Sequence, residues 1–257
     1  MKLEDIKSIG VMGGGVMGGG IAQTAILTGY KAIVRDLSDE ILAKMKNTIV
    51  NGRFGLKGGV ERGKHTQEQM DLALRNLSVT TKVEDLMDCD LIIEAIGGAS
   101  PTEIENKDLK LKVFAELDRV VKKDAIFTSN TSHFTIADLA VAVERKELFM
   151  GMHWFSPANI MKLVELVYTS DTSEEVVKVL EGLCQRLGKT SVLVKDVPGD
   201  TGFIGNRVMG AARREALKIV EEGIATAEGV NTVMTLGFNW PAGPLPSGGP
   251  GARSGWQ

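Results

Sequence analysis

A long run without any charged side chain, from Ser8 to Tyr30, most constrains how this chain can fold. It contains the segment GVMGGGVMGGGIA, in which seven residues are glycine. A run of this length could cross a bilayer, direct secretion, or form a glycine turn that contacts phosphate. The three possibilities imply different classes of protein.

The two membrane interpretations fit the flanking sequence poorly. Gly14 and Gly18 satisfy the small-xxx-small motif of membrane helix pairs, but the chain has no other comparable stretch. A secretion signal begins with a basic segment, whereas Glu4 and Asp5 here offset the neighbouring lysines. We therefore expect neither a membrane helix nor a signal peptide.

The run instead divides by the period of its apolar residues. IKSIGVM, at 6–12, is typical of a short buried strand, and the glycines follow at once. IAQTAILTG is helical in pattern and ends at Gly29, and YKAIVRD, at 30–36, predicts a second strand. The order is strand, glycine turn, helix, strand.

Within this unit the glycines follow the pattern G-x-G-x-x-G. Gly13 permits the tight turn, Gly15 allows the backbone to approach a pyrophosphate, and Gly18 allows the helix to pack close to the strand. The helix N-terminus then faces the anion. We therefore predict that this turn binds a dinucleotide. Its other residues are Gly14, Val16 and Met17.

Asp36 lies at the end of the second predicted strand. In dinucleotide-binding units an acidic residue occupies this position after the glycine motif. Its carboxylate could accept hydrogen bonds from both ribose hydroxyls of NAD and would repel a 2'-phosphate. Arg35 beside it would instead favour NADP, and a flexible loop with a surface aspartate is the alternative without a cofactor. The sequence favours NAD.

Strand and helix patterns alternate through most of the chain, which predicts a mostly parallel sheet with helices on both faces, a Rossmann-type doubly wound α/β fold. A polar, glycine-rich stretch interrupts the pattern at 51–64. Helices are expected at about 40–50, from 66, at 106–121, after 135 and from 173, and strands near 77–80, 90–97, 125–130, 149–155, 162–167 and 190–196.

The pattern changes after DVPG at 196–199, where only helical segments follow, at about 203–222 and 225–236. We expect an NAD-binding domain at 1–197 and a partial, all-helical C-terminal domain at 198–244. The segment 245–257 is rich in Pro and Gly, which predicts a disordered tail.

Charge and cysteine content exclude several classes of partner. The net charge is −3, so no basic face for nucleic acid or an anionic membrane is indicated. Cys89 and Cys184 lie far apart, without the spacing of a metal site or a disulfide framework. The composition fits a reducing cytoplasm, with no metal.

The segment GMHWFSPANIMKLVELV carries a second chemical pattern. Glu165 lies in an apolar strand, where an ionised carboxylate is costly unless it is paired, and His153 precedes it on the other side of a turn. Such a pair makes a general base. The alternative is that His153 caps a strand and Glu165 faces solvent. His65 and His133 have no such companion in the sequence.

Several ordered motifs together resemble the NAD-dependent L-3-hydroxyacyl-CoA dehydrogenase family, over roughly Ile6 to Pro244. They are the glycine turn GGGVMGGGIA, SNTS at 129–132, the His153 and Glu165 pair, and FIGNR at 203–207. The resemblance implies oxidation of an L-3-hydroxyacyl-CoA to a 3-oxoacyl-CoA, with an acyl-CoA thioester as substrate and a homodimer as assembly.

The resemblance also implies roles for single residues. His153 is the catalytic base and Glu165 orients it, while Ser132 and Asn206 hydrogen-bond the substrate near the reacting carbon. Further residues at the cofactor are Glu105, Lys110 and Asn130. For Glu105 and Lys110 a solvated helix face is the alternative.

Three departures from the family pattern leave other functions open. The connection at 95–104 is longer than usual, PGDTGF interrupts the usual PGF, and the chain ends soon after GFNWPAGP. We therefore keep two alternatives: an impaired NAD-binding fragment or partner subunit, with a weakened dimer, and a related hydroxy-acid dehydrogenase that does not use CoA. The expected setting is fatty-acid, butanoate or aromatic-acid catabolism.

Overall fold

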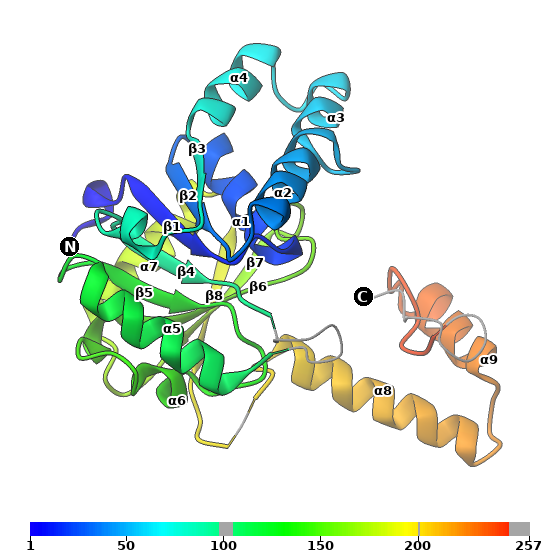
Figure 1. The fold of residues 1–257 in the computed structure, drawn as a ribbon. Coiled ribbons are helices and arrows are strands. Elements are labelled where there is room, and N and C mark those ends of the chain that lie inside the picture. Colours follow the sequence, from blue (N-terminus) through cyan, green and yellow to red (C-terminus); the bar gives the residue numbers. More distant parts are fainter. Residues whose placement is uncertain (98–104, 200, 247–257) are drawn as a thin grey trace. The chain divides into compact units, whose positions relative to one another are not determined.

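The computed structural model describes residues 1–97, 105–199 and 201–246 (Figure 1). The chain divides into two compact units, Met1–Thr201 and Gly202–Gln257. The first unit contains the sheet, and the described part of the second is helical.

One eight-stranded sheet forms the centre of the first unit, in the order β3-β2-β1-β4-β5-β6-β7-β8. Every neighbouring pair is parallel except β6 and β7, which run antiparallel. The predicted mostly parallel, doubly wound sheet is confirmed. Its strands are β1 Ser8–Met12, β2 Lys31–Arg35, β3 Leu77–Thr80, β4 Leu91–Glu94, β5 Ile126–Ser129, β6 Phe149–Trp154, β7 Leu163–Tyr168 and β8 Thr190–Lys195.

Helices cover the sheet, and several begin at a side-chain cap. The hydroxyl of Ser38, for example, accepts the backbone N–H of Glu40, which satisfies one of the unpaired donors at the start of a helix. The helices of this unit are α1 Val16–Leu27, α2 Asp39–Asn51, α3 Leu56–Glu61, α4 Gln67–Arg75, α5 Lys107–Val120, α6 Ile136–Ala140 and α7 Glu174–Arg186, with single 3-10 turns at Leu3–Asp5, Val83–Leu86 and Lys146–Leu148.

The two faces of the sheet have separate helical covers. Buried apolar side chains of α1 and α7 join those of the strands in one core cluster. On the near side in Figure 1 lie α5 and α6, where Phe114 of α5 packs edge-on against Phe127 and Phe149. Apolar residues in the strands are buried on both faces, as a parallel sheet requires.

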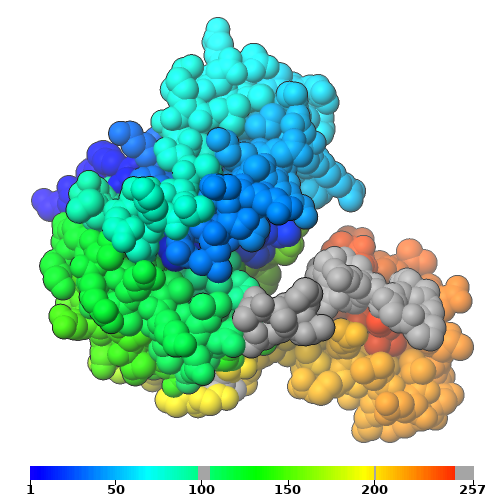
Figure 2. All heavy atoms as spheres, in the orientation of Figure 1, coloured from blue at the N-terminus to red at the C-terminus, as the bar shows by residue number. Residues whose placement is uncertain are grey.

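Helix α3 lies inside the glycine-rich stretch that the sequence pattern left without structure; it belongs to the lobe of α2, α3 and α4, blue to cyan in Figure 2. Leu56 is fully buried there, and a Cβ on Gly59 would come within 2.1 Å of the His65 ring. The glycines permit close packing here, so burial outweighs their low helix propensity.

The second unit contains α8 Gly205–Glu221 and α9 Ala227–Thr232, and α9 continues as a π-helical turn at Val233–Gly237. Both predicted helices are present. Leu245, where the predicted disordered tail begins, is only 2% exposed, and its backbone N–H and C=O both bond the Asn231 side chain. The packed part of this unit therefore includes Leu245, while 247–257 lie outside the described residues.

Candidate active site

The carboxyl ends of β1, β4, β5 and β6 meet at one edge of the sheet, because these strands are parallel neighbours. The strand order reverses between β1 and β4, and ligands of doubly wound sheets bind at such a point. The glycine turn follows β1, Glu94 ends β4, the SNTS segment follows β5, and His153 lies near the end of β6.

The glycine turn has the geometry that a dinucleotide requires. Gly13 has a φ of 106°, and a Cβ on Gly18 would lie 1.9 Å from the Gly13 carbonyl oxygen. Within the described chain, no side chain caps the N-terminus of α1, and a Cβ on Gly15 would meet no atom within 4 Å. The first N–H groups of α1 therefore present an anion site that the described residues do not fill.

Asp36 is held against this turn. Its Oδ2 accepts the backbone N–H of Gly14 at 2.6 Å, and its Oδ1 accepts that of Leu37 at 2.7 Å. These two bonds fix the carboxylate beside the start of α1.

A pocket of about 490 Å³ lies beside the turn. Its cationic residues are Lys44 and Arg53, both from the region of α2, and the connection between β6 and β7 contributes Pro157 and Asn159. Other lining residues belong to the glycine turn, to α1 and to α2, including Gly14, Gly15, Val16, Gly20, Ile41 and Met45. The pocket can therefore hold an apolar group that carries an anionic part.

His153 and Glu165 face each other across the antiparallel pair of β6 and β7. His153 Nδ1 lies 2.7 Å from Glu165 Oε2, and both side chains are buried. The predicted contact is present. A solvent-facing Glu165 on an edge strand is wrong, because the glutamate is only 2% exposed and β7 pairs with β8 on its other side. The carboxylate requires the hydrogen on Nδ1, so Nε2 is the nitrogen that can exchange a proton.

The segment after β5 is tied to β6 next to this histidine. Asn130 Oδ1 accepts the backbone N–H of Trp154 at 2.8 Å. Thr131 and Ser132 follow, and both contact Glu105. The SNTS segment thus lies at the same edge of the sheet as His153.

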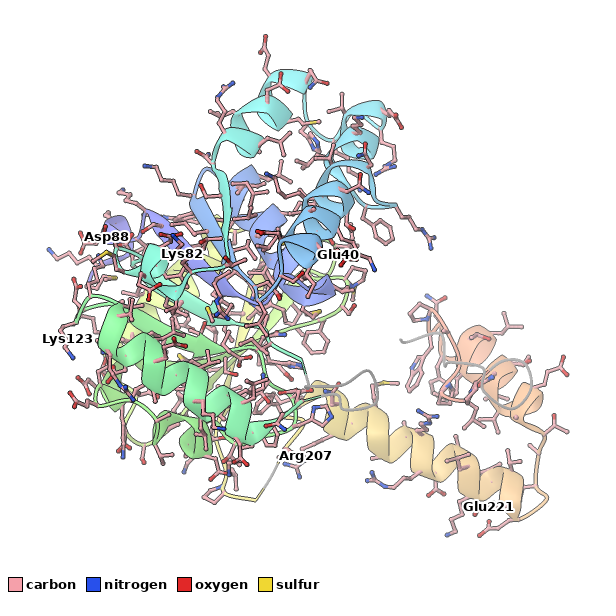
Figure 3. All side chains as sticks on the ribbon, in the orientation of Figure 1. Glu40, Lys82, Asp88, Lys123, Arg207 and Glu221 are labelled. Carbon is pink, nitrogen blue, oxygen red and sulfur yellow. The ribbon has the colours of Figure 1, made fainter. Side chains whose placement is uncertain are left out.

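Lys110 is the centre of a buried ion cluster. Its Nζ lies 2.5 Å from Glu94 Oε1 and 3.2 Å from Glu105 Oε2. With Lys110 1% exposed, the interpretation as a solvated helix face is wrong for this residue. Asp88 and Lys123, by contrast, are exposed and lie at the margin of the first unit (Figure 3).

Sequence reasoning missed Glu94, which it counted only as part of an apolar strand. Its Oε2 accepts the hydroxyl of Ser129 at 2.5 Å, and its Oε1 accepts the N–H of Ile96 at 2.7 Å. The signal available in the sequence was the position of Glu94: an acidic residue at the C-terminal end of a buried strand indicates a functional carboxylate. Glu94 and Lys110 are therefore buried beside the SNTS segment, and Glu105 is partly buried there.

Glu105 joins this cluster to His133. Burial alone would raise the pKa of Glu105, but the charge of Lys110 and hydrogen bonds from Ser132, Thr131 and His133 outweigh it and lower the pKa. His133 Nδ1 lies 2.8 Å from Glu105 Oε1. The expectation that His133 has no acidic partner is therefore wrong. The partner, Glu105, precedes α5 in the sequence whereas His133 follows it, so no local sequence pattern indicates the pair.

Asn206 lies in α8 of the second unit, just after Phe203, whose φ is 49°. Its contact with substrate stays a prediction. Of the long connection at 95–104, residues 98–104 lie outside the described part of the chain, as does Asp200 of the PGDTGF interruption.

The described residues contain no group of three or more His, Cys, Asp or Glu arranged to hold a metal ion. Cys89 and Cys184 are buried, and burial raises the pKa of each thiol to about 12. No helix in the described part of the chain is long and apolar enough to cross a membrane.

Two family models match the chain. The NAD binding domain of 3-hydroxyacyl-CoA dehydrogenase matches residues 8–197, and the C-terminal domain of 3-hydroxyacyl-CoA dehydrogenase matches residues 202–247. Together they extend over both units.

Similar proteins agree with these models. A probable 3-hydroxybutyryl-CoA dehydrogenase of Deinococcus radiodurans is 38% identical over 92% of this chain and 80% of its own length. The mitochondrial hydroxyacyl-coenzyme A dehydrogenase of Rattus norvegicus is 38% identical over 93% and 74%. The crystal structure of (S)-3-hydroxybutyryl-CoA dehydrogenase from Ralstonia eutropha superposes with a TM-score of 0.86 at 35% identity, over 94% of this chain and 81% of that one.

Proposed function

The chain belongs to the 3-hydroxyacyl-CoA dehydrogenase family, an NAD-dependent oxidoreductase family, and from this we propose which residues carry the reaction. The reaction is the reversible oxidation of a 3-hydroxyacyl-CoA to a 3-oxoacyl-CoA. The buried pair of His153 and Glu165, at the sheet edge that carries the glycine turn, is the main support for the proposed mechanism.

His153 Nε2 accepts the proton of the substrate 3-hydroxyl as the C3–O bond becomes a carbonyl. Bound NAD supplies the acceptor for the hydride that leaves C3. Glu165 accepts the Nδ1 hydrogen at 2.7 Å, so its negative charge stabilises the imidazolium that forms. In the reductive direction His153 returns the proton to the oxygen.

Ser132 and Asn206 donate hydrogen bonds to the substrate oxygen in this proposal, and so stabilise charge that develops on it. The bond from Trp154 N–H to Asn130 supports the role of Ser132, because it anchors the SNTS segment beside the end of β6. For Asn206 the support is its place in the FIGNR motif.

The cofactor residues divide into three groups. The turn Gly13–Gly18 binds the pyrophosphate, and Asp36 binds the adenosine ribose. Glu105, Lys110 and Asn130 form the third group, which is held together around the SNTS segment next to β6. The cations of the neighbouring pocket, Lys44 and Arg53, suit the phosphates of a CoA thioester.

An NADH oxidation assay with acetoacetyl-CoA beside free acetoacetate tests the proposal. Turnover of the thioester, with little turnover of the acid, is expected. Turnover of the acid alone would favour a hydroxy-acid dehydrogenase that does not use CoA. NADH binding without turnover of either compound would favour an impaired NAD-binding protein.

Cofactor choice is a second test. We expect NADH to be preferred over NADPH, and Asp36→Ala to lower kcat/KM for NADH by roughly ten- to hundredfold, since a hydrogen bond to a charged group contributes about 1.5–3 kcal/mol. Asp36→Asn keeps an acceptor for the Gly14 N–H and should keep the turn folded while it relaxes the preference. Equal kcat/KM for both cofactors in the unmodified protein would contradict the assignment.

Three finer points stay predictions. They are a role in fatty-acid, butanoate or aromatic-acid catabolism, a cytoplasmic location, and a homodimer. The two buried free thiols support a reducing compartment. Exposed apolar side chains of the second unit, Val208, Leu217 and Ile224, support association, because such groups are usually covered.

A further inference from the structure

We propose that His133 is a positioning residue for the substrate site: it occupies Glu105 Oε1 and thereby leaves the hydroxyl hydrogen of Ser132 available to the substrate oxygen. The inference rests on the proposed role of Ser132. It concerns a histidine for which sequence reasoning found no partner.

Four hydrogen-bond donors occupy the two oxygens of the Glu105 carboxylate. Oε1 accepts the backbone N–H of Ser132 at 3.0 Å and faces His133 Nδ1 at 2.8 Å. Oε2 accepts the hydroxyl of Thr131 at 2.5 Å and pairs with Lys110 Nζ at 3.2 Å. A carboxylate has about four lone-pair sites, so these four donors saturate it.

The same contacts fix the tautomer of His133. The ionised Glu105 can only accept, so a 2.8 Å contact is a hydrogen bond only if Nδ1 carries the hydrogen. Ser132 Oγ lies 3.0 Å from the same nitrogen. A protonated Nδ1 has no lone pair to offer, so Ser132 cannot donate to it.

Among the residues that the structure describes, the Ser132 hydroxyl is therefore left with Glu105 Oε1 as its acceptor, at 3.5 Å, the limit of a hydrogen bond. His133 and the Ser132 backbone already occupy that oxygen. The hydroxyl hydrogen thus stays available for a substrate oxygen.

Without His133, the Ser132 hydroxyl would donate to Glu105 instead of to the substrate oxygen. With the lone pair on Oε1 vacated, a small rotation of Ser132 brings its hydroxyl onto the carboxylate, which is a stronger acceptor than a ketone oxygen. Ser132 then presents lone pairs to the substrate oxygen. His133 is 47% exposed, so its replacement leaves no large cavity.

Kinetics of acetoacetyl-CoA reduction by the full chain test the proposal in four variants. Ser132→Ala should lower kcat by roughly a hundredfold, as for loss of one donor to a developing oxyanion, and His133→Phe by about tenfold with KM nearly unchanged. His133→Asn offers an amide donor in place of Nδ1 and should stay within about twofold of the unmodified protein. The double variant Ser132→Ala/His133→Phe should match Ser132→Ala alone.

Each outcome has a separate meaning. If Ser132→Ala keeps full activity, the proposed function of Ser132 fails. If Ser132→Ala is impaired but His133→Phe is not, or if the two losses multiply in the double variant, His133 does not act through Ser132. A loss in His133→Asn as large as in His133→Phe also contradicts the proposal. NADH binding and thermal midpoints, measured in parallel, should be unchanged in all four variants.

Discussion

Replacement of His153 by Gln should lower turnover of acetoacetyl-CoA by roughly two or more orders of magnitude, with NADH binding nearly unchanged, since a general acid and base is lost. The glutamine amide can still donate a hydrogen bond toward Glu165, so the pair keeps a polar partner in its buried site. It cannot take up a proton. Fluorescence titration with NADH beside steady-state kinetics separates the two effects.

Glu165→Gln should reduce turnover almost as much, because a neutral amide does not stabilise the imidazolium and no longer fixes its tautomer. Glu174→Gln, the same change at an exposed position on α7, is the matched control and should leave kcat unaltered. Near-normal turnover in both His153→Gln and Glu165→Gln would disprove the assignment of this pair as the catalytic base.

The second large effect concerns stability. Lys110→Met should destabilise the first unit by roughly 3–5 kcal/mol, because loss of one partner leaves buried charge uncompensated. Glu94 and Glu105 would then lie together without the ammonium group that both contact. Thermal or urea unfolding measures the loss. Lys123→Met, at a lysine 77% exposed, is the control and should change stability by less than about 0.5 kcal/mol.

The pH dependence of this loss identifies its cause. In the unmodified protein the pKa of Glu105 is lowered, so its contribution is present at neutral pH and is lost as the pH falls through the folded pKa. Without Lys110 the pKa of Glu105 should instead be raised, and its protonation would relieve the repulsion between the two carboxylates. The difference in the free energy of unfolding between Lys110→Met and the unmodified protein should therefore become smaller as the pH is lowered from 7.5 to 5. A difference independent of pH would indicate a packing defect.

The sequence predicted the features that depend on local pattern. The period of apolar residues around the glycine turn predicted β1, α1 and β2, because burial on a sheet and a helix imposes different spacings. The cost of an unpaired carboxylate in an apolar strand predicted the contact of Glu165 with His153. These signals lie within short segments and need no knowledge of the fold.

Contacts between distant segments were not predictable in this way. Glu94 and Lys110 come from different elements of the chain, and Glu105 and His133 lie on either side of α5 in the sequence. The packing of α5 and the parallel pairing of β4 and β5 bring these segments together. Helix α3 was missed for a related reason. Its glycines resemble a loop until the His65 ring is packed against Gly59.

The antiparallel pairing of β6 and β7 has a consequence for how substrate binding can diversify. The dyad is aligned by the hydrogen-bond register of the two strands, in which His153 lies opposite Glu165, and not by the connection at 155–162. That connection lines the pocket beside the turn through Pro157 and Asn159. Exchange of this connection between relatives should therefore alter how tightly the CoA part of the substrate is bound while proton transfer is retained, so mutation can explore substrate binding separately from chemistry.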